Sequence, residues 1–262
     1  MTYATIAVER HGSVARVLLN RPDARNAMNQ QMIADLLDYF TVIRDDRSLR
    51  VVVLGGAGGT FCAGGDIREM GASATASREL QIANIARLDD MLLAVNQAPQ
   101  VVVAEVRGAA LGGGVGLVCV ADIALAAENT TLGFPEVRLG IVPAVVSPYV
   151  VARIGLGHAR RLMLTGALLD GTQAAAVGLV TGAYPAEALS DAVNAVVRDA
   201  LKASPSALAA CKALLFEVAG RPPRDTEGYR VDLLHRLQTS DEVQEGLRAF
   251  MEKRKPAWVE DA

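Results

Sequence analysis

The chain has 262 residues, of which 51% are hydrophobic and only 4% aromatic. A chain of this length can bury a substantial core, and here aliphatic side chains must supply it. The formal net charge of −3 lacks the basic excess that binding to a nucleic-acid backbone requires, which argues against nucleic acid as a partner.

The N-terminal residues show no basic segment followed by an apolar one, so no secretory signal is predicted. No apolar run approaches the roughly 20 residues of a membrane-spanning helix, and we expect no membrane association. Cys62, Cys119 and Cys211 show no metal-ligand spacing and are expected to be buried free thiols. We therefore expect a cytoplasmic protein without a metal site.

Strands and helices alternate through the first half of the chain. The expected elements are strands over 14–20, 50–54 and 101–106, a further apolar run over 123–127, and helices over 28–43 and 85–95. Asn29 is a candidate N-cap for the first helix, and Pro99 closes the second. Strands that alternate with helices imply βα units and a largely parallel sheet, so the predicted fold class is α/β.

After about Tyr184 the pattern changes to helical periodicity, interrupted at Pro205 and at Pro222-Pro223. We expect residues 1–186 to form an α/β body that carries the active site and residues 187–262 to form a helical region. The apolar stripes of that region need a surface to pack on, which the body or a neighbouring subunit would provide.

Two glycine-rich turns, at 58–67 and 108–117, each follow a predicted strand. Such turns let main-chain N–H groups approach a ligand closely, and a helix that begins there adds partial positive charge. Two converging N–H groups form an oxyanion hole, which stabilises negative charge on a carbonyl oxygen. Neither turn matches a phosphate-binding loop. The alternative is that the glycines serve only tight turns and close helix packing.

The segments FCAGGDI (61–67), GAALGGG (108–114) and FPEVRLGIVP (134–143) resemble, in order and spacing, the crotonase (enoyl-CoA hydratase/isomerase) superfamily. The opening LNRP (19–22) with RNAM (25–28) and the ending GLRAFMEKRKP (246–256) resemble it as well. The resemblance implies a spiral of ββα units and a C-terminal helical region that builds trimers, often paired into hexamers. It also implies an acyl-CoA substrate, with CoA as part of the substrate rather than a separate cofactor.

The same resemblance implies roles for individual residues. The N–H groups of Gly65 and Gly113 would form the oxyanion hole around the thioester oxygen and stabilise an enolate. Lys253 would reach the CoA phosphates, those of a neighbouring subunit's ligand included. The residues implied to lie along the CoA are Arg25, Ala27, Ala63, Asp66 and Ile67. Asp66 also suits a capping role at the helix that follows the first turn.

Hydratases of this family commonly use two glutamates, and this chain has Glu136 at one of the positions and Gly116 at the other. A partly buried Glu136 would have a raised pKa, which suits proton transfer near neutral pH. A single glutamate is compatible with hydration of an enoyl-CoA, the reaction of a lyase, and with isomerisation between 3-enoyl and 2-enoyl esters. A third alternative is a non-catalytic acyl-CoA-binding member of the family.

Finer similarity favours hydration. Residues 114–119 and 141–151 resemble bacterial hydratases of branched glutaconyl-CoA esters, namely 3-methylglutaconyl-CoA and isohexenylglutaconyl-CoA, from leucine and terpene breakdown. Such substrates carry their own carboxylate, and the absence of a second enzyme carboxylate at Gly116 would avoid repulsion between like charges.

Overall fold

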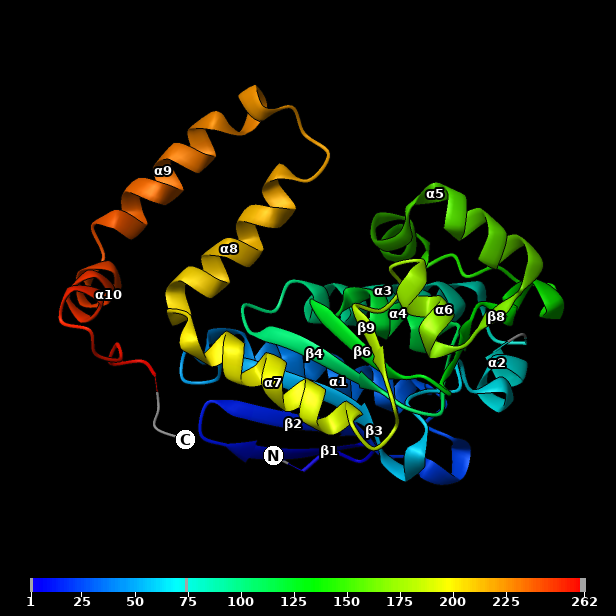
Figure 1. Ribbon diagram of the computed structural model, residues 1–262. Helices are drawn as coiled ribbons and strands as arrows, with labels where there is room; N and C mark the ends of the chain where they lie inside the picture. The colour runs from blue at the N-terminus through cyan, green and yellow to red at the C-terminus, as the bar shows by residue number, and fades with distance from the viewer. Residues whose placement is uncertain (1, 74, 260–262) are drawn as a thin grey trace.

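The computed structural model describes residues 2–73 and 75–259 (Figure 1). Its strands are β1 (Ile6–His11), β2 (Val14–Leu19), β3 (Val51–Gly56), β4 (Val101–Val106), β5 (Ala109–Leu111), β6 (Ile123–Ala127), β7 (Thr131–Gly133), β8 (Leu168–Leu169) and β9 (Gly182–Tyr184). Its α-helices are α1 (Gln30–Val42), α2 (Ile67–Ser73), α3 (Arg78–Asn96), α4 (Gly113–Val120), α5 (Ser147–Thr165), α6 (Gly171–Ala176), α7 (Leu189–Lys202), α8 (Pro205–Val218), α9 (Glu227–Gln238) and α10 (Asp241–Met251).

The main sheet has the strand order β1-β2-β3-β4-β6-β9, and only β1 and β2 run antiparallel. A smaller sheet, in the order β5-β7-β8, lies beyond the ends of β4 and β6 along the chain. The predicted strands over 14–20, 50–54, 101–106 and 123–127 and the largely parallel sheet are therefore confirmed. Strand β1 was not predicted: it is an edge strand whose second half, Glu9 to His11, is polar and exposed.

Both faces of the main sheet are covered, which explains its continuous apolar strands. Successive residues of β3 point to opposite sides. Val51 and Val53 pack with helix α7, whereas Val52 and Leu54 pack in the larger core under α1, α3 and α4. Figure 1 shows this layering, with α7 on one face and α1 on the other.

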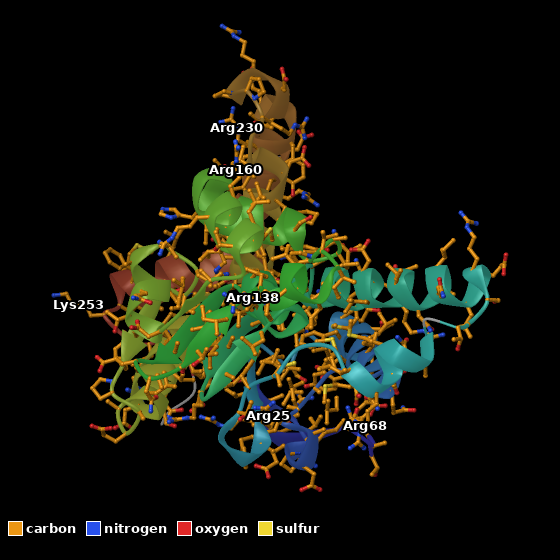
Figure 2. All side chains as sticks on the ribbon, turned by 90° about the vertical axis from the view of Figure 1, so that its right-hand side faces the viewer. Arg25, Arg68, Arg138, Arg160, Arg230 and Lys253 are labelled. Atoms are coloured by element: carbon orange, nitrogen blue, oxygen red, sulfur yellow. The ribbon has the colours of Figure 1, made fainter. Side chains whose placement is uncertain are left out.

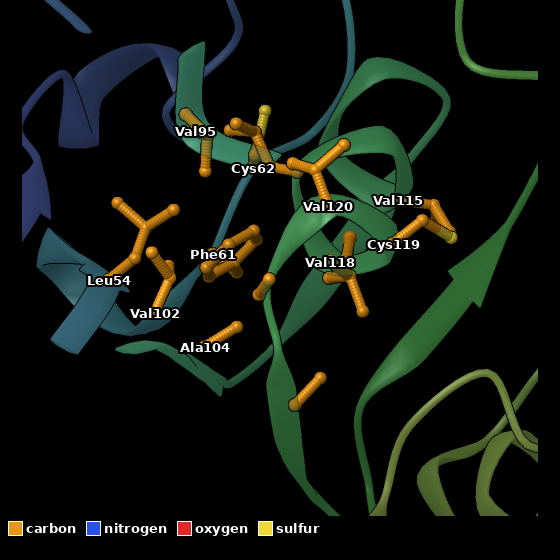
Figure 3. Packing of buried hydrophobic residues seen from close by; sticks show 14 of the residues in the cluster. Leu54, Phe61, Cys62, Val95, Val102, Ala104, Val115, Val118, Cys119 and Val120 are labelled. Carbon is orange, nitrogen blue, oxygen red and sulfur yellow. The ribbon is translucent and has the colours of Figure 1, made fainter. Parts of the chain in front are cut away.

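Phe61 lies at the centre of the larger core, directly before the first glycine-rich turn. Figure 3 shows its ring between Leu54 and Val102 of the sheet and Val118 of α4. The ring is fully buried. Removing so large a buried side chain typically costs about 3–5 kcal/mol. Phe61 therefore fixes the start of the turn to both the sheet and helix α4.

The predicted helices over 28–43 and 85–95 are confirmed as α1 and α3. The N-cap is confirmed too, since Asn29 Oδ1 accepts a hydrogen bond from the Met32 N–H at 2.9 Å. In the described part of the chain, no helix is long and apolar enough to cross a lipid bilayer.

The C-terminal region is helical, as predicted, but its helices differ in where they pack. Helix α7 lies on the sheet, whereas α8, α9 and α10 extend away from it (Figure 1). The chain then returns to the body: Arg50 Nη1 donates to the Trp258 carbonyl oxygen at 2.8 Å, and Trp258 Nε1 donates to the Lys202 carbonyl oxygen at 3.1 Å. That residues 187–262 serve oligomerisation stays a prediction.

The cysteine prediction needs one correction. Cys62 and Cys119 are buried free thiols, but Cys211 is exposed. Cys211 lies on α8, which buries none of its own side chains within the chain. The prediction took the apolar surroundings of Cys211 in the sequence as a sign of burial, but α8 extends away from the body of the protein.

Candidate active site

The two glycine-rich turns lie side by side. The Cys62 N–H donates to the Ala109 carbonyl oxygen at 2.9 Å, and the Leu111 N–H donates to the Cys62 carbonyl oxygen at 3.0 Å, so Cys62 pairs with Ala110 in parallel register. Met28 links the two turns further on, because its main chain pairs with Gly65 and its side chain lies beside Gly113. The chemistry-bearing positions of the two turns are thus neighbours although they are far apart in the sequence.

The close approach of the turns requires Gly64. Its φ of +99° lies in the region that glycine adopts readily. A Cβ at this position would also lie 3.2 Å from the Leu111 carbonyl oxygen, a tight contact with main chain. Any other residue here would therefore push the two turns apart.

The Gly65 and Gly113 N–H groups have no hydrogen-bond acceptor among residues 2–73 and 75–259. On either side of Gly65, the Gly64 carbonyl oxygen and the Asp66 N–H both bond to the main chain of Met28, at 2.7 and 2.9 Å. Gly113 is the first residue of α4, where N–H groups have no partner inside the helix. The arrangement suits an oxyanion hole, and the assignment of that role to Gly65 and Gly113 stays a prediction.

Glu136 lies beside this pair of donors. It belongs to the short 3-10 helix η4 (Pro135–Leu139), which follows β7. Gly112, directly before Gly113, has its Cα so close to the carboxylate that a Cβ there would lie 2.6 Å from Glu136 Oε1. The carboxylate thus lies next to the residue that carries the free Gly113 N–H, an arrangement suited to moving a proton beside a developing oxyanion.

The electrostatic surroundings of Glu136 favour its use as a base. Burial raises the pKa of Glu136, and a hydrogen bond from its own main-chain N–H offsets only part of that effect. Oε2 is buried and has no hydrogen-bond donor among the described residues. A carboxylate that is desolvated and unpaired holds a proton more readily than one in water, which suits it to both accept and return one.

Position 116, at which the family resemblance would place a second glutamate, has no room for a side chain. A Cβ on Gly116 would lie 2.4 Å from Val146 Cγ1 and 3.7 Å from Leu92 Cδ2. Val146 is itself buried, at the start of α5. The residue that fills this space was not identified from the sequence, because nothing in the pattern links position 146 to position 116.

The residues expected to lie along CoA come together on one side of the turns. The Ala63 N–H donates to the Arg25 carbonyl oxygen at 3.0 Å, and Met28 pairs with Gly65, so segment 25–28 runs along segment 63–66. The Arg25 side chain is exposed, and Ile67 is 73% exposed, which is unusual for isoleucine. Both are free to meet a ligand, and contact with CoA stays a prediction.

Asp66 has a structural role in this ridge. Its Oδ1 accepts from the Arg68 N–H at 3.1 Å at the start of α2, and its Oδ2 pairs with Arg21 Nη2 at 3.0 Å. These bonds, the one from Arg21 first among them, outweigh the effect of burial and lower the pKa of Asp66. The capping interpretation is therefore confirmed.

A family model described as enoyl-CoA hydratase/isomerase matches residues 9–261. The chain belongs to the enoyl-CoA hydratase/isomerase family. Among solved structures, it is similar to Pseudomonas aeruginosa AtuE, with a TM-score of 0.96 and 41% identity over 98% of this chain and 100% of that one. An enoyl-CoA hydratase/isomerase from Marinobacter aquaeolei gives a TM-score of 0.93 and 38% identity over 98% and 99% of the two chains.

An enoyl-CoA hydratase from Shewanella pealeana is similar as well, with a TM-score of 0.93 and 32% identity over 97% of this chain and 96% of that one. The crotonase fold and the family predicted from the motifs are thus confirmed. At the level of the family, the activity is that of an enoyl-CoA hydratase or isomerase acting on acyl-CoA. Trimer formation and the branched glutaconyl substrate are finer predictions that stay open to test.

Lys253 is not brought to the other candidate residues of this chain. It follows α10 and is exposed, with a φ of +56°. Figure 2 shows Lys253 at the left edge of the view, apart from Arg25 and Arg68, which lie below the centre. Contact with the CoA phosphates, of this chain's ligand or of a neighbouring subunit's, stays a prediction.

An apolar groove of about 420 Å³ opens between α3 and the segment that leads into α5. Leu92 and Val146, which enclose Gly116, follow closely on Asp89 and Val145 of its lining along the same two segments. Asp89 is the one charged residue in its lining. The residues that line the groove are Ile82, Ile85, Ala86, Asp89, Ala144, Val145 and Pro148.

Proposed function

We propose that this protein hydrates a branched, carboxylated enoyl-CoA ester of the glutaconyl type, with Glu136 as its proton-transferring residue. The observation that carries the proposal is the position of the half-buried Glu136 carboxylate against Gly112, next to the free N–H group of Gly113. A carboxylate in that place reaches the carbons next to a thioester whose oxygen occupies the oxyanion hole.

A single carboxylate is sufficient for the proton transfers of hydration. As the water oxygen bonds to the β-carbon, Glu136 takes a proton from that water. The electron pair of the carbon–carbon double bond moves towards the thioester oxygen, where the N–H groups of Gly65 and Gly113 stabilise the enolate. Glu136 then returns the proton to the α-carbon, which restores the thioester carbonyl. The atoms added are those of one water molecule, and the enzyme ends unchanged.

The carboxylated substrate is supported by sequence resemblance and by the apolar filling of position 116. Val146 and Leu92 occupy the space around Gly116, so no second enzyme carboxylate faces the substrate there. A substrate that carries its own negative charge would be repelled by such a group and is tolerated without it.

The groove between α3 and the start of α5 favours the longer of the two candidate acyl branches. Its volume of about 420 Å³ lies in the range of small-molecule pockets, and its lining is mainly aliphatic. An isohexenyl arm would bury apolar surface there at about 25 cal/mol per Å². A methyl branch would leave most of the groove empty. Isohexenylglutaconyl-CoA is therefore the favoured substrate.

Isomerisation is the second candidate function, and the lone Glu136 favours it equally. An isomerase needs one carboxylate to remove a proton from the α-carbon and return it to the γ-carbon around the same enolate. The water molecule is the difference between the two reactions: hydration consumes one and isomerisation does not.

We also propose that the protein assembles as a homotrimer or as a hexamer of paired trimers in the cytoplasm. Large apolar side chains on α8, α9 and α10 are exposed in the single chain, among them Leu215, Val231, Leu247 and Phe250. An exposed apolar surface of this kind is typical of a subunit interface. Lys253, at the end of the same region, would then lie near a neighbour's CoA. The protein is expected to need no cofactor beyond the CoA of its substrate.

A turnover assay with four esters tests the proposal. The esters are isohexenylglutaconyl-CoA, 3-methylglutaconyl-CoA, crotonyl-CoA and a 3-enoyl-CoA. We expect the conjugated double-bond absorbance to fall with the carboxylated esters, fastest with the isohexenyl one. Conjugation gained from the 3-enoyl ester, without hydration of the others, would establish an isomerase instead. Binding of all four without turnover would indicate the non-catalytic alternative.

A further inference from the structure

Two methionines flank the two glycines of the proposed oxyanion hole. Met28 lies beside Gly113, since its Cε is 3.6 Å from the position that a Cβ on Gly113 would take. Met70, on α2, lies beside Gly65: its Sδ is 3.0 Å from the equivalent Cβ position. The sulfur of Met70 therefore lies on the side of Gly65 to which a side chain would point, and the N–H of Gly65 has no acceptor among the described residues.

The two sulfurs differ in access to solvent. Met28 is 5% exposed, whereas Met70 is 40% exposed. Met70 sits on a helix of seven residues whose first residue, Ile67, is itself mostly exposed. A dissolved oxidant can thus reach Met70 at the site while the partner methionine on the other glycine is shielded.

We propose that Met70 is an oxidation site that controls the oxyanion hole. A peroxide transfers one oxygen atom to Met70 Sδ: the O–O bond breaks, an S=O bond forms, and the peroxide is reduced to water or to an alcohol. The product, methionine sulfoxide, carries a polar oxygen that accepts hydrogen bonds, unlike the thioether from which it forms.

The sulfoxide oxygen would compete with the substrate for Gly65. Because Met70 Sδ lies against Gly65, we place the sulfoxide oxygen near the free N–H of this residue, where a hydrogen bond would occupy one of the two proposed oxyanion donors. Loss of one oxyanion donor costs about 10²- to 10³-fold in rate in other enzymes. Reduction by a methionine sulfoxide reductase restores the thioether, so the block is reversible.

Most other sulfur groups in the described residues are shielded or are replaced in the test, and the sulfoxide at the partly buried Met163 is quantified beside that at Met70. Met32 and Met91 are fully buried. Burial raises the pKa of Cys62 to about 11 and that of Cys119 to about 12, so neither forms the reactive thiolate near neutral pH. Cys211 is exposed and is replaced by serine in every protein of the test. Met251, 75% exposed on α10 in the single chain, provides a control outside the active site, and its own sulfoxide yield shows whether the oxidant reaches it in the assembled protein.

The experiment treats the Cys211→Ser protein, and the same protein with Met70→Leu or Met251→Leu, with graded hydrogen peroxide. Peptide mass spectrometry measures the sulfoxide at each methionine, and the turnover of each variant is divided by its own untreated rate. We expect turnover to fall in step with Met70 sulfoxide, to about one hundredth at full conversion. Methionine sulfoxide reductase should restore it, Met70→Leu should resist, and Met251→Leu should behave as its parent.

Equal inactivation of the Met70→Leu protein, or full turnover with Met70 converted to sulfoxide, would overturn the proposal. Turnover as a readout rests on the proposed function, so the affinity for butanoyl-CoA, a saturated ester that binds without reacting, is measured in parallel. If untreated protein hydrates nothing, the proposed function fails. If Met70 sulfoxide then still weakens butanoyl-CoA binding, the inference about Met70 stands; unchanged affinity would reject it as well.

Discussion

Val146 occupies the space into which any side chain at position 116 would project. The distance from a Cβ on Gly116 to Val146 Cγ1 would be 2.4 Å, shorter than any real contact between carbons. The two positions are 30 residues apart in the sequence but form one unit of packing in the core, with Leu92 on the third side. A glutamate at 116 therefore requires Val146 or the backbone around it to move.

The first prediction follows from this pair. Gly116→Glu should lower the free energy of unfolding by about 2 kcal/mol or more, because it overpacks a full core and buries a charge there. Adding Val146→Gly should restore part of that stability by making room. Urea unfolding of the two variants and of Val146→Gly alone measures the coupling. Additive losses would contradict the packing relationship.

The second prediction concerns Glu136 and the rate. Glu136→Gln removes the proton acceptor and should lower kcat by about 10²- to 10⁴-fold with little change in the affinity for a saturated acyl-CoA. Because burial raises the pKa of Glu136, kcat/KM of the wild type should rise as pH increases through that raised value and the carboxylate ionises. A pH profile that is flat across the weakly acidic range would argue against Glu136 as the base.

The third prediction concerns Glu136 and stability. A folded-state pKa above the unfolded value means that the folded state binds the proton more tightly, so stability is present at low pH and lost as pH rises through the raised pKa. Glutamine mimics the protonated form and keeps its stability at all pH values. The Tm of Glu136→Gln should therefore exceed that of the wild type at pH 7 and match it near pH 4. The opposite order at pH 7 would show that the carboxylate is stabilised by a partner.

The fourth prediction uses the groove. Ala86→Phe should lower kcat/KM for isohexenylglutaconyl-CoA by about tenfold or more, since an aromatic ring there fills the place of the longer arm. Activity with 3-methylglutaconyl-CoA should change little. Ala83→Phe is the matched control, as Ala83 is exposed on the same helix but does not line the groove. If both esters are affected equally, the groove does not hold the arm.

The fifth prediction concerns the attachment of α8. Lys212 Nζ lies 2.8 Å from Asp122 Oδ2, and it also donates to the Gln100 carbonyl oxygen at 3.1 Å. Burial raises the pKa of Asp122 and lowers that of Lys212, so pairing does not fully offset desolvation. Lys212→Met leaves the partly exposed Asp122 carboxylate without its cationic partner, with the Val102 N–H still bonded to it, and should cost about 1 kcal/mol. Chemical denaturation should show that the double variant Lys212→Met/Asp122→Asn loses less unfolding free energy than Lys212→Met alone. An equal loss in the two proteins would indicate that the ion pair is not the cause.

Much of the fold could be predicted because both faces of the central strands are buried. The valine runs at 51–53 and 101–103 can be recognised as buried strands from their own residues alone. Strand β1 was not predicted, because an edge strand needs apolar residues on one face only and its sequence pattern is weaker. The exposure of Cys211 was not predicted, because the spacing of apolar residues does not show whether a helix packs on its own chain or on another subunit.

The candidate site was predictable where glycine and glutamate follow a recognisable pattern, and not where distant segments meet. Outside the site, Arg153 shows the same limit: it ties α5 to the body by donating to the Leu179 carbonyl oxygen at 2.8 Å and to the Ala121 carbonyl oxygen at 2.8 Å. Val146 beside Gly116 and Met70 beside Gly65 are of the same kind. Such contacts depend on the three-dimensional path of the chain, which local patterns do not contain.

The mass of the product formed in water enriched in oxygen-18 tests the central claim most directly. Wild-type protein and Glu136→Gln are incubated with isohexenylglutaconyl-CoA, and the acyl-CoA product is measured by mass spectrometry. We predict that the wild type adds one molecule of labelled water and that Glu136→Gln adds almost none in the same time. A product of unchanged mass with a shifted double bond, or equal labelling by the Glu136→Gln protein, would contradict hydration by Glu136.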